Sequence, residues 1–142
     1  MTEHATWNLL RARMPVGGHY SRIESHDTAP GFPDVHWTLE GKTGGFELKY
    51  ARMPTAAYPF RGEKLGLRKT QHIWIRDELE AGGRVLLALQ VFANIYFLEG
   101  RLHKAVDDMT LEKLRENSSL VWTPDRAHPE DLRQLMLSPG PV

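Results

Sequence analysis

The sequence predicts an α/β fold in which a central mixed β-sheet is flanked by α-helices. Three observations favour this class. Two alternating segments around a glycine-rich turn predict a β-hairpin over residues 35–50. Apolar residues at the helical period predict a helix over residues 67–81, ended by Gly82-Gly83. A nearly continuous apolar run over residues 85–91 is typical of a strand buried on both faces.

Local signals predict the remaining elements. Apolar residues at helical spacing predict a short helix over residues 4–14, which ends at Pro15. Partial alternation predicts a strand over residues 19–25, and the prolines of residues 26–33 predict a rigid loop. Further along, we expect a long loop over 51–66, a hairpin or bend at Asn94 before a strand over 95–98, a helix over 111–116, a strand over 120–123 and a helix over 129–136.

Length and composition predict one domain of an ordinary globular protein. The chain has 142 residues, of which 41% are hydrophobic and 25% charged. The absence of cysteine excludes disulfides and thiolate zinc sites. No basic-then-apolar leader is visible, and the apolar run Val85–Phe92 is too short to span a bilayer, so we expect a cytoplasmic protein with no membrane partner. The expected parts of the single domain are an N-terminal helix (1–18), a catalytic core (19–98) and a C-terminal α/β extension (99–142).

The charges are unevenly distributed although the net charge is zero. Residues 49–72 contain six lysines and arginines against one acid, Glu63, whereas residues 77–131 contain eleven acids against six bases. This asymmetry predicts a localised anion-binding face. The acidic C-terminal half, residues 99–131, is alternatively a surface for a protein partner.

The predicted hairpin carries a group of residues with metal-site chemistry. Side chains alternate along a strand, so Glu47 and Lys49 project from one side, and a hairpin through the turn 40–45 brings Asp34 alongside them. Mg²⁺ prefers oxygen ligands and is commonly held by one or two carboxylates plus substrate phosphate. Asp34 and Glu47 are candidate ligands, with the carbonyl of Leu48 as a third, and Lys49 is placed to orient the attacking water.

Each of these features also has an ordinary structural interpretation. Glu-x-Lys occurs on many half-exposed strands, and an Asp after a Pro is a common turn residue. Trp74 is better explained as packing for its helix than as a platform for a base. The histidines lack the spacing of a zinc site.

Three motifs together resemble the PD-(D/E)XK nuclease superfamily. They are Gly31-Phe32-Pro33-Asp34, Phe46-Glu47-Leu48-Lys49 and Gln71-His72-Ile73-Trp74. The chain is most similar to the small VRR-type and Holliday-junction-resolvase-like nucleases, many of them encoded by phages. The resemblance covers residues 20–91 and implies a restriction-endonuclease-like core.

The resemblance also implies roles for single residues. Asp34 and Glu47 would be metal ligands, Lys49 the catalytic lysine, and Gln71 the helix glutamine that points into such sites. A further acid often precedes these motifs, and Glu24 fits that place, although it falls on a strand or bend rather than a helix. Weaker candidates for that acid are Glu3 and Asp27.

The expected function is hydrolysis of DNA phosphodiester bonds by an endonuclease that uses Mg²⁺, with Mn²⁺ as the alternative. The family leans toward branched DNA, and a four-way junction needs two sites, which suggests a homodimer. The expected phosphate contacts are Arg61, Lys64, Arg68 and Lys69. Two alternatives stay open: a nucleic-acid-binding or phage assembly module that keeps the fold without cutting, and a protein-interaction domain.

Overall fold

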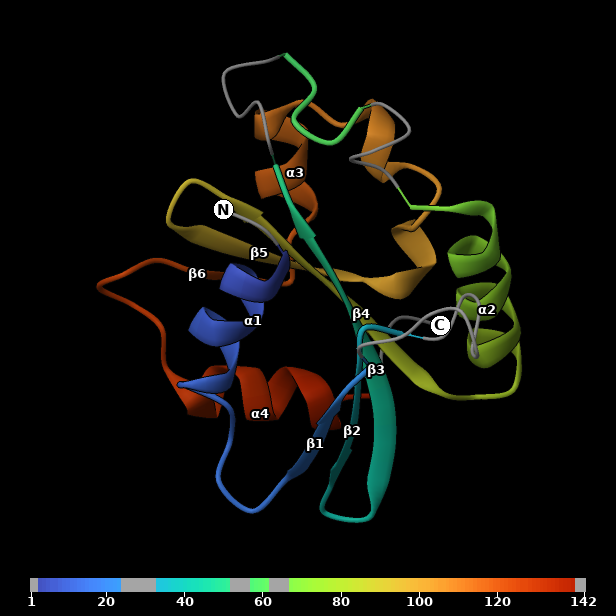
Figure 1. Ribbon diagram of the computed structural model, residues 1–142, viewed down its shortest axis with the longest axis vertical. Helices are drawn as coiled ribbons and strands as arrows, with labels where there is room; N and C mark the ends of the chain where they lie inside the picture. Colours follow the sequence, from blue (N-terminus) through green and yellow to red (C-terminus); the bar gives the residue numbers. More distant parts are fainter. Residues whose placement is uncertain (1–2, 24–32, 52–56, 62–66, 140–142) are drawn as a thin grey trace.

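The computed structural model describes residues 3–23, 33–51, 57–61 and 67–139 (Figure 1). Its centre is a six-stranded sheet with the strands in chain order. The strands are β1 (His19–Arg22), β2 (Val35–Leu39), β3 (Lys42–Tyr50), β4 (Arg84–Val91), β5 (Asn94–Glu99) and β6 (Leu120–Trp122). Neighbouring strands are antiparallel except β3 and β4, which are parallel. The expected mixed sheet is confirmed.

Helices cover both faces of this sheet. They are α1 (Glu3–Arg11), α2 (Lys69–Glu80), α3 (Leu111–Asn117) and α4 (Pro129–Leu137), with the short 3₁₀ segments η1 (Gly100–Leu102) and η2 (Val106–Asp108). Helix α2 lies in the long connection that the parallel pair β3–β4 requires. Helices α1 and α4 contribute to the apolar core on one face, whereas α2 and α3 contribute to the core on the other (Figure 1). The flanking helices of the predicted fold class are therefore also present.

The hairpin between β2 and β3 is tighter than its glycines suggest. The sequence predicts a turn over residues 40–45, but the turn consists of Glu40 and Gly41 alone, with φ angles of 49° and 80°. Positive φ at both central residues is the signature of a type I′ turn. Gly44 belongs to β3 because the Trp37 ring occupies the space above it, where a Cβ atom would come within 2.3 Å of the ring. The predicted turn boundaries were wrong because Lys42 already pairs with Leu39, which leaves Glu40 and Gly41 alone between the strands.

Helix α2 begins and ends at recognisable caps. Its N-cap is Arg68, whose backbone is extended, so the helix starts two residues after the predicted boundary. At the other end Gly82 has φ of 92°, the N–H of Gly83 donates to the carbonyl of Glu78 at 2.8 Å, and Gly82 donates to Leu79 at 3.1 Å. These two bonds form a Schellman motif, which confirms the glycine stop that the sequence predicts.

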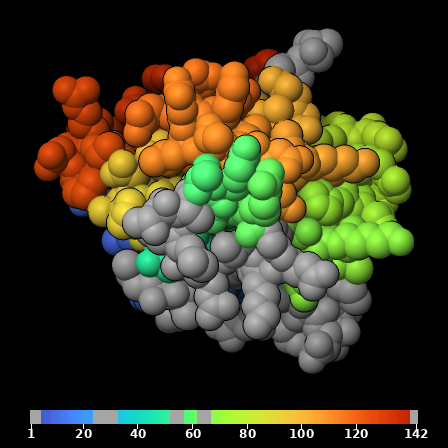
Figure 2. Space-filling model, turned by 90° about the horizontal axis from the view of Figure 1, so that it is seen from above, coloured from blue at the N-terminus to red at the C-terminus, as the bar shows by residue number. Residues whose placement is uncertain are grey.

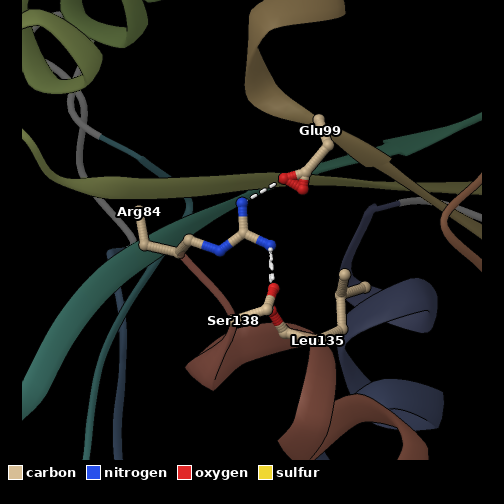
Figure 3. A network of polar contacts seen from close by, with 4 residues as sticks. All are labelled: Arg84, Glu99, Leu135 and Ser138. Atoms are coloured by element: carbon tan, nitrogen blue, oxygen red, sulfur yellow. Dashed lines mark hydrogen bonds and ion pairs between the residues drawn. The ribbon is translucent and has the colours of Figure 1, made fainter. Parts of the chain in front are cut away.

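The C-terminal part of the chain continues the same sheet. Strand β5 forms the expected hairpin with β4, and β6 pairs with β5. The guanidinium of Arg84 on β4 joins this part to the rest: it bonds Glu99 on β5, the carbonyl of Leu135 at 2.9 Å and the hydroxyl of Ser138 at 3.0 Å (Figure 3). One buried charge pair therefore ties two strands to the end of α4.

The end of the predicted strand 19–25 (residues 24–25) and parts of the two predicted loops (26–32, 52–56 and 62–66) lie outside the described residues. Among the helices that are described, none is both long and apolar enough to cross a membrane.

Candidate active site

The β2–β3 hairpin brings Asp34, Glu47 and Lys49 to one face of the sheet. Trp37 and Phe46 belong to the core cluster beneath α1 and α4. Because side chains alternate along a strand, Asp34, Glu47 and Lys49 point to the opposite face, where α2 packs. Since Val35 pairs with Phe46, Asp34 comes opposite Glu47 one step further along the hairpin.

Leu48 and Arg22 both contact Asp34 at the start of β2. Oδ2 of Asp34 accepts the backbone N–H of Leu48 at 2.7 Å, and the residue is 1% exposed. On the other side, Nη1 of Arg22 lies 3.6 Å from Oδ1 and donates to the Asp34 carbonyl at 3.2 Å. The N–H and C=O of a residue in an extended strand point to the same side, so we expect the Leu48 carbonyl on the Asp34 side as well.

Gln71 links the start of α2 to Glu47. Its Nε2 donates to Oε2 of Glu47 at 2.9 Å, while its Oε1 accepts the backbone N–H of Arg68 at 2.8 Å. The second bond is the N3 half of a capping box, in which a Glu or Gln side chain reaches back to the N-cap backbone. Because the carbonyl oxygen of the amide is used by the cap, its NH₂ group faces Glu47, which is fully buried. Helix capping thus orients the amide toward the carboxylate.

Lys49 lies two residues beyond Glu47 on the same face, opposite Leu89 of β4, and is 9% exposed. Its charge acts on Asp107 of η2. Burial raises the pKa of Asp107, and the charges of His72, Lys49 and Arg61 partly oppose that rise. The C-terminal segment therefore reaches the electrostatic surroundings of the hairpin residues, although the resemblance ended before it.

The residues present fit a hard divalent cation. Asp34, Glu47 and the Leu48 carbonyl offer oxygen donors, the type that Mg²⁺ prefers, rather than the nitrogen and sulfur donors typical of structural zinc sites. No group of three or more His, Cys, Asp and Glu that could hold a metal occurs within the described ranges. A third carboxylate is not required, because Mg²⁺ usually retains several waters.

The predicted DNA contacts are found in different settings. Arg61 lies over the ring of Tyr58 at 3.6 Å and bonds Asp108 at 3.2 Å. In Figure 2 the segment 57–61 (green) lies against the orange C-terminal segment, consistent with this pair. Arg68 and Lys69 are exposed at the start of α2. Glu24, Asp27 and Lys64 lie outside the described residues, and Glu3 is the first residue of α1.

Sequence patterns alone did not reveal Arg22 as the ionic partner of Asp34. The available signal was its place on a predicted strand next to the hairpin, since Arg22 pairs with Val35 in the observed register. Trp74 behaves as the sequence predicts: it packs on the core beneath α2, and its ring lies over Gly45, where a Cβ atom would be at 3.4 Å.

Comparison with known proteins adds no family assignment. A scan of the chain against protein-family models finds no match, and a search of curated proteins also finds none.

Proposed function

We propose that this protein is a Mg²⁺-dependent endonuclease that hydrolyses phosphodiester bonds of DNA. The observation that carries the proposal is the pair of buried carboxylates, Asp34 and Glu47, on adjacent strands with Lys49 on the same face. Burying two acids is costly unless positive charge compensates them. Arg22 supplies positive charge to Asp34, and Lys49 lies on the same face; a divalent cation held between the hairpin and its substrate would add to this compensation.

The residues of the site would have three roles: metal binding, positioning of a ligand and stabilisation of the reacting phosphate. Asp34, Glu47 and the Leu48 carbonyl would hold the metal, which would lower the pKa of a bound water and polarise a phosphoryl oxygen. Gln71 keeps the carboxylate of Glu47 in place through its 2.9 Å bond. Lys49 places an ammonium group near the reacting phosphate, where it orients the attacking water and offsets developing negative charge.

Hydrolysis joins the water oxygen to phosphorus and breaks the bond from phosphorus to one sugar oxygen. The products are a phosphate monoester and a hydroxyl end, and the leaving oxygen takes up a proton. The resemblance to junction-resolving nucleases extends the proposal to branched DNA and a homodimer.

Cleavage of supercoiled plasmid and of branched oligonucleotides in Mg²⁺, Mn²⁺ or EDTA tests the proposal. We expect metal-dependent cutting by the natural chain, and its loss in Asp34→Asn and Glu47→Gln. Asp125→Asn is the matched control because Asp125 is an exposed acid in a turn. Melting curves report whether each variant is folded.

Wild-type rates in folded Asp34→Asn and Glu47→Gln would refute this site. DNA that is bound but left uncut with every metal would favour the non-cleaving nucleic-acid-binding module instead.

A further inference from the structure

A cleft beside the proposed active site is lined by positive charge from two distant parts of the chain. Its lining residues are Lys69, His72, Ile73, Arg76 and Lys104, and its volume is about 520 Å³. Helix α2 supplies the first four, and Lys104 comes from the segment between η1 and η2. Neither Arg76 nor Lys104 belongs to the basic cluster that the sequence analysis identified.

The cleft and the proposed active site share one helix. Gln71 points inward to Glu47, whereas the next residue, His72, lines the cleft. The Nδ1 atoms of His72 and His103 are 2.6 Å apart, so a hydrogen bond between the rings fastens α2 to the segment that carries Lys104. Both walls of the cleft are thereby held next to the residues that would hold the metal.

The charges of the cleft are available to different degrees. Arg76 contacts the carboxylate of Asp77 at 3.0 Å, and this exposed pair offsets part of its charge. Within the described part of the chain, neither Lys69 nor Lys104 forms an ion pair. Both lysines are exposed to solvent.

The histidines add little charge to the cleft near neutral pH. Burial lowers the pKa of both His72 and His103, and Lys104 lowers each further, whereas the charge of Asp107 and a backbone hydrogen bond at Leu67 raise the pKa of His72. The positive field therefore comes from the two lysines and, in part, from Arg76. Ile73, which is 39% exposed, adds an apolar surface suited to a sugar or a base.

We infer that this cleft binds the phosphate backbone of the nucleic-acid substrate, so that the DNA leaves the active site across α2 toward Lys104. The inference rests on the proposed function for its choice of polyanion. A lysine binds a phosphate as a point charge, and the phosphate is the same at every base pair. Such contacts therefore position a DNA duplex without discriminating between base sequences.

DNA binding in Ca²⁺ and in EDTA, measured by fluorescence anisotropy over a range of salt concentrations, tests the inference. The key variant is Lys104→Ala, compared with Lys69→Ala and Arg76→Ala. Arg101→Ala is the matched control, because Arg101 is an exposed cation of the neighbouring η1 that lines a different hollow.

Each lysine variant is expected to reduce the slope of log affinity against log salt by about 0.9, the value for one duplex phosphate contact. At 0.1 M salt this corresponds to roughly eightfold weaker binding, because the affinity scales as salt concentration to that power. Arg76→Ala is expected to show a smaller loss of DNA affinity, and Arg101→Ala is expected to bind like the natural chain. Sequence preference stays the same.

The inference would be overturned if Lys104→Ala showed the same DNA affinity and salt slope as Arg101→Ala, whether both variants are unchanged or both are weakened equally. If the natural chain cuts DNA while Lys104→Ala binds normally, the active site stands and the cleft assignment fails. If no metal supports cutting but Lys104→Ala still loses affinity and slope, the cleft stands and the nuclease proposal fails.

Discussion

Replacing Gln71 by Glu tests the link between the capping box and the buried carboxylate. The change converts the NH₂ group into an oxygen at nearly constant size. A Glu at N3 still accepts the Arg68 N–H, since Glu is a usual capping-box residue. The atom that now donates to Glu47 at 2.9 Å, however, becomes a second acceptor in a buried site. Two carboxylates in such contact cannot both stay ionised, so one of them takes up a proton.

The loss of stability follows from the uptake of that proton. Holding a proton at pH 7 on a carboxyl whose ordinary pKa is about 4.3 costs about 3.7 kcal/mol, while the shared proton restores the lost hydrogen bond. We therefore expect Gln71→Glu to lower the free energy of unfolding by about 3–4 kcal/mol at pH 7. That is a large part of the total for a domain, which is typically about 5–15 kcal/mol.

The stability of the Gln71→Glu variant should decrease as the pH rises. The folded variant binds one proton more than the unfolded chain between pH 5 and 7, because the folded pKa is raised. Its stability is therefore greatest at low pH and falls by about 1.4 kcal/mol for each pH unit of increase, relative to the natural chain. If Glu47 helps to hold a divalent cation, added Mg²⁺ should recover part of this loss.

Urea unfolding at pH 5, 6 and 7, with EDTA and with Mg²⁺, measures these quantities. The control is Gln134→Glu, the same chemical change at an exposed position of α4, where we expect an effect within about 0.5 kcal/mol. Equal effects in the two variants, or a loss that does not vary with pH, would show that the Gln71 amide does not support Glu47.

Three further predictions address Lys49 as the proposed catalytic lysine, the histidine pair and the ion pair in Figure 3. Lys49→Ala is expected to slow cleavage about 100-fold or more while Mg²⁺ affinity in calorimetry stays unchanged, and lost affinity would assign Lys49 to metal binding instead. Burial lowers the pKa of His72 and His103 in the folded chain, so the free energy of unfolding should fall as the pH drops below about 6.5. In melting curves His103→Gln should make this fall less steep, and a pH profile equal to that of the natural chain would contradict the prediction. Arg84→Met leaves the Glu99 carboxylate buried without its cation and should lower the free energy of unfolding by about 3–5 kcal/mol. The double variant Arg84→Met/Glu99→Met should recover much of this loss in urea unfolding. An Arg84→Met variant of near-natural stability would refute the role of this pair.

The sequence by itself determined which elements form and which way their side chains face. Alternation along residues 35–39 and 46–50 is a local property of extended chain, so it separated Trp37 and Phe46 from Asp34, Glu47 and Lys49 without knowledge of the fold. The end of α2 was equally local, since Gly82 can adopt the left-handed backbone that closes the helix. The order and type of the later elements likewise follow from their periodicity.

The tertiary structure decided what these local rules leave open. Gly44 could be assigned to the turn or to β3, and in the structure it pairs with Trp37, in the register that sets Asp34 opposite Glu47. The Trp37 ring covers Gly44, so this register requires a residue without a Cβ atom there. A count of charges along the chain places Lys104 in an acidic half, yet packing of the η1–η2 segment on α2 puts it in the same cleft as Lys69. Periodicity describes a residue relative to its neighbours in the chain, whereas contacts between distant segments depend on how their faces pack, and the basic cleft exists only at that level.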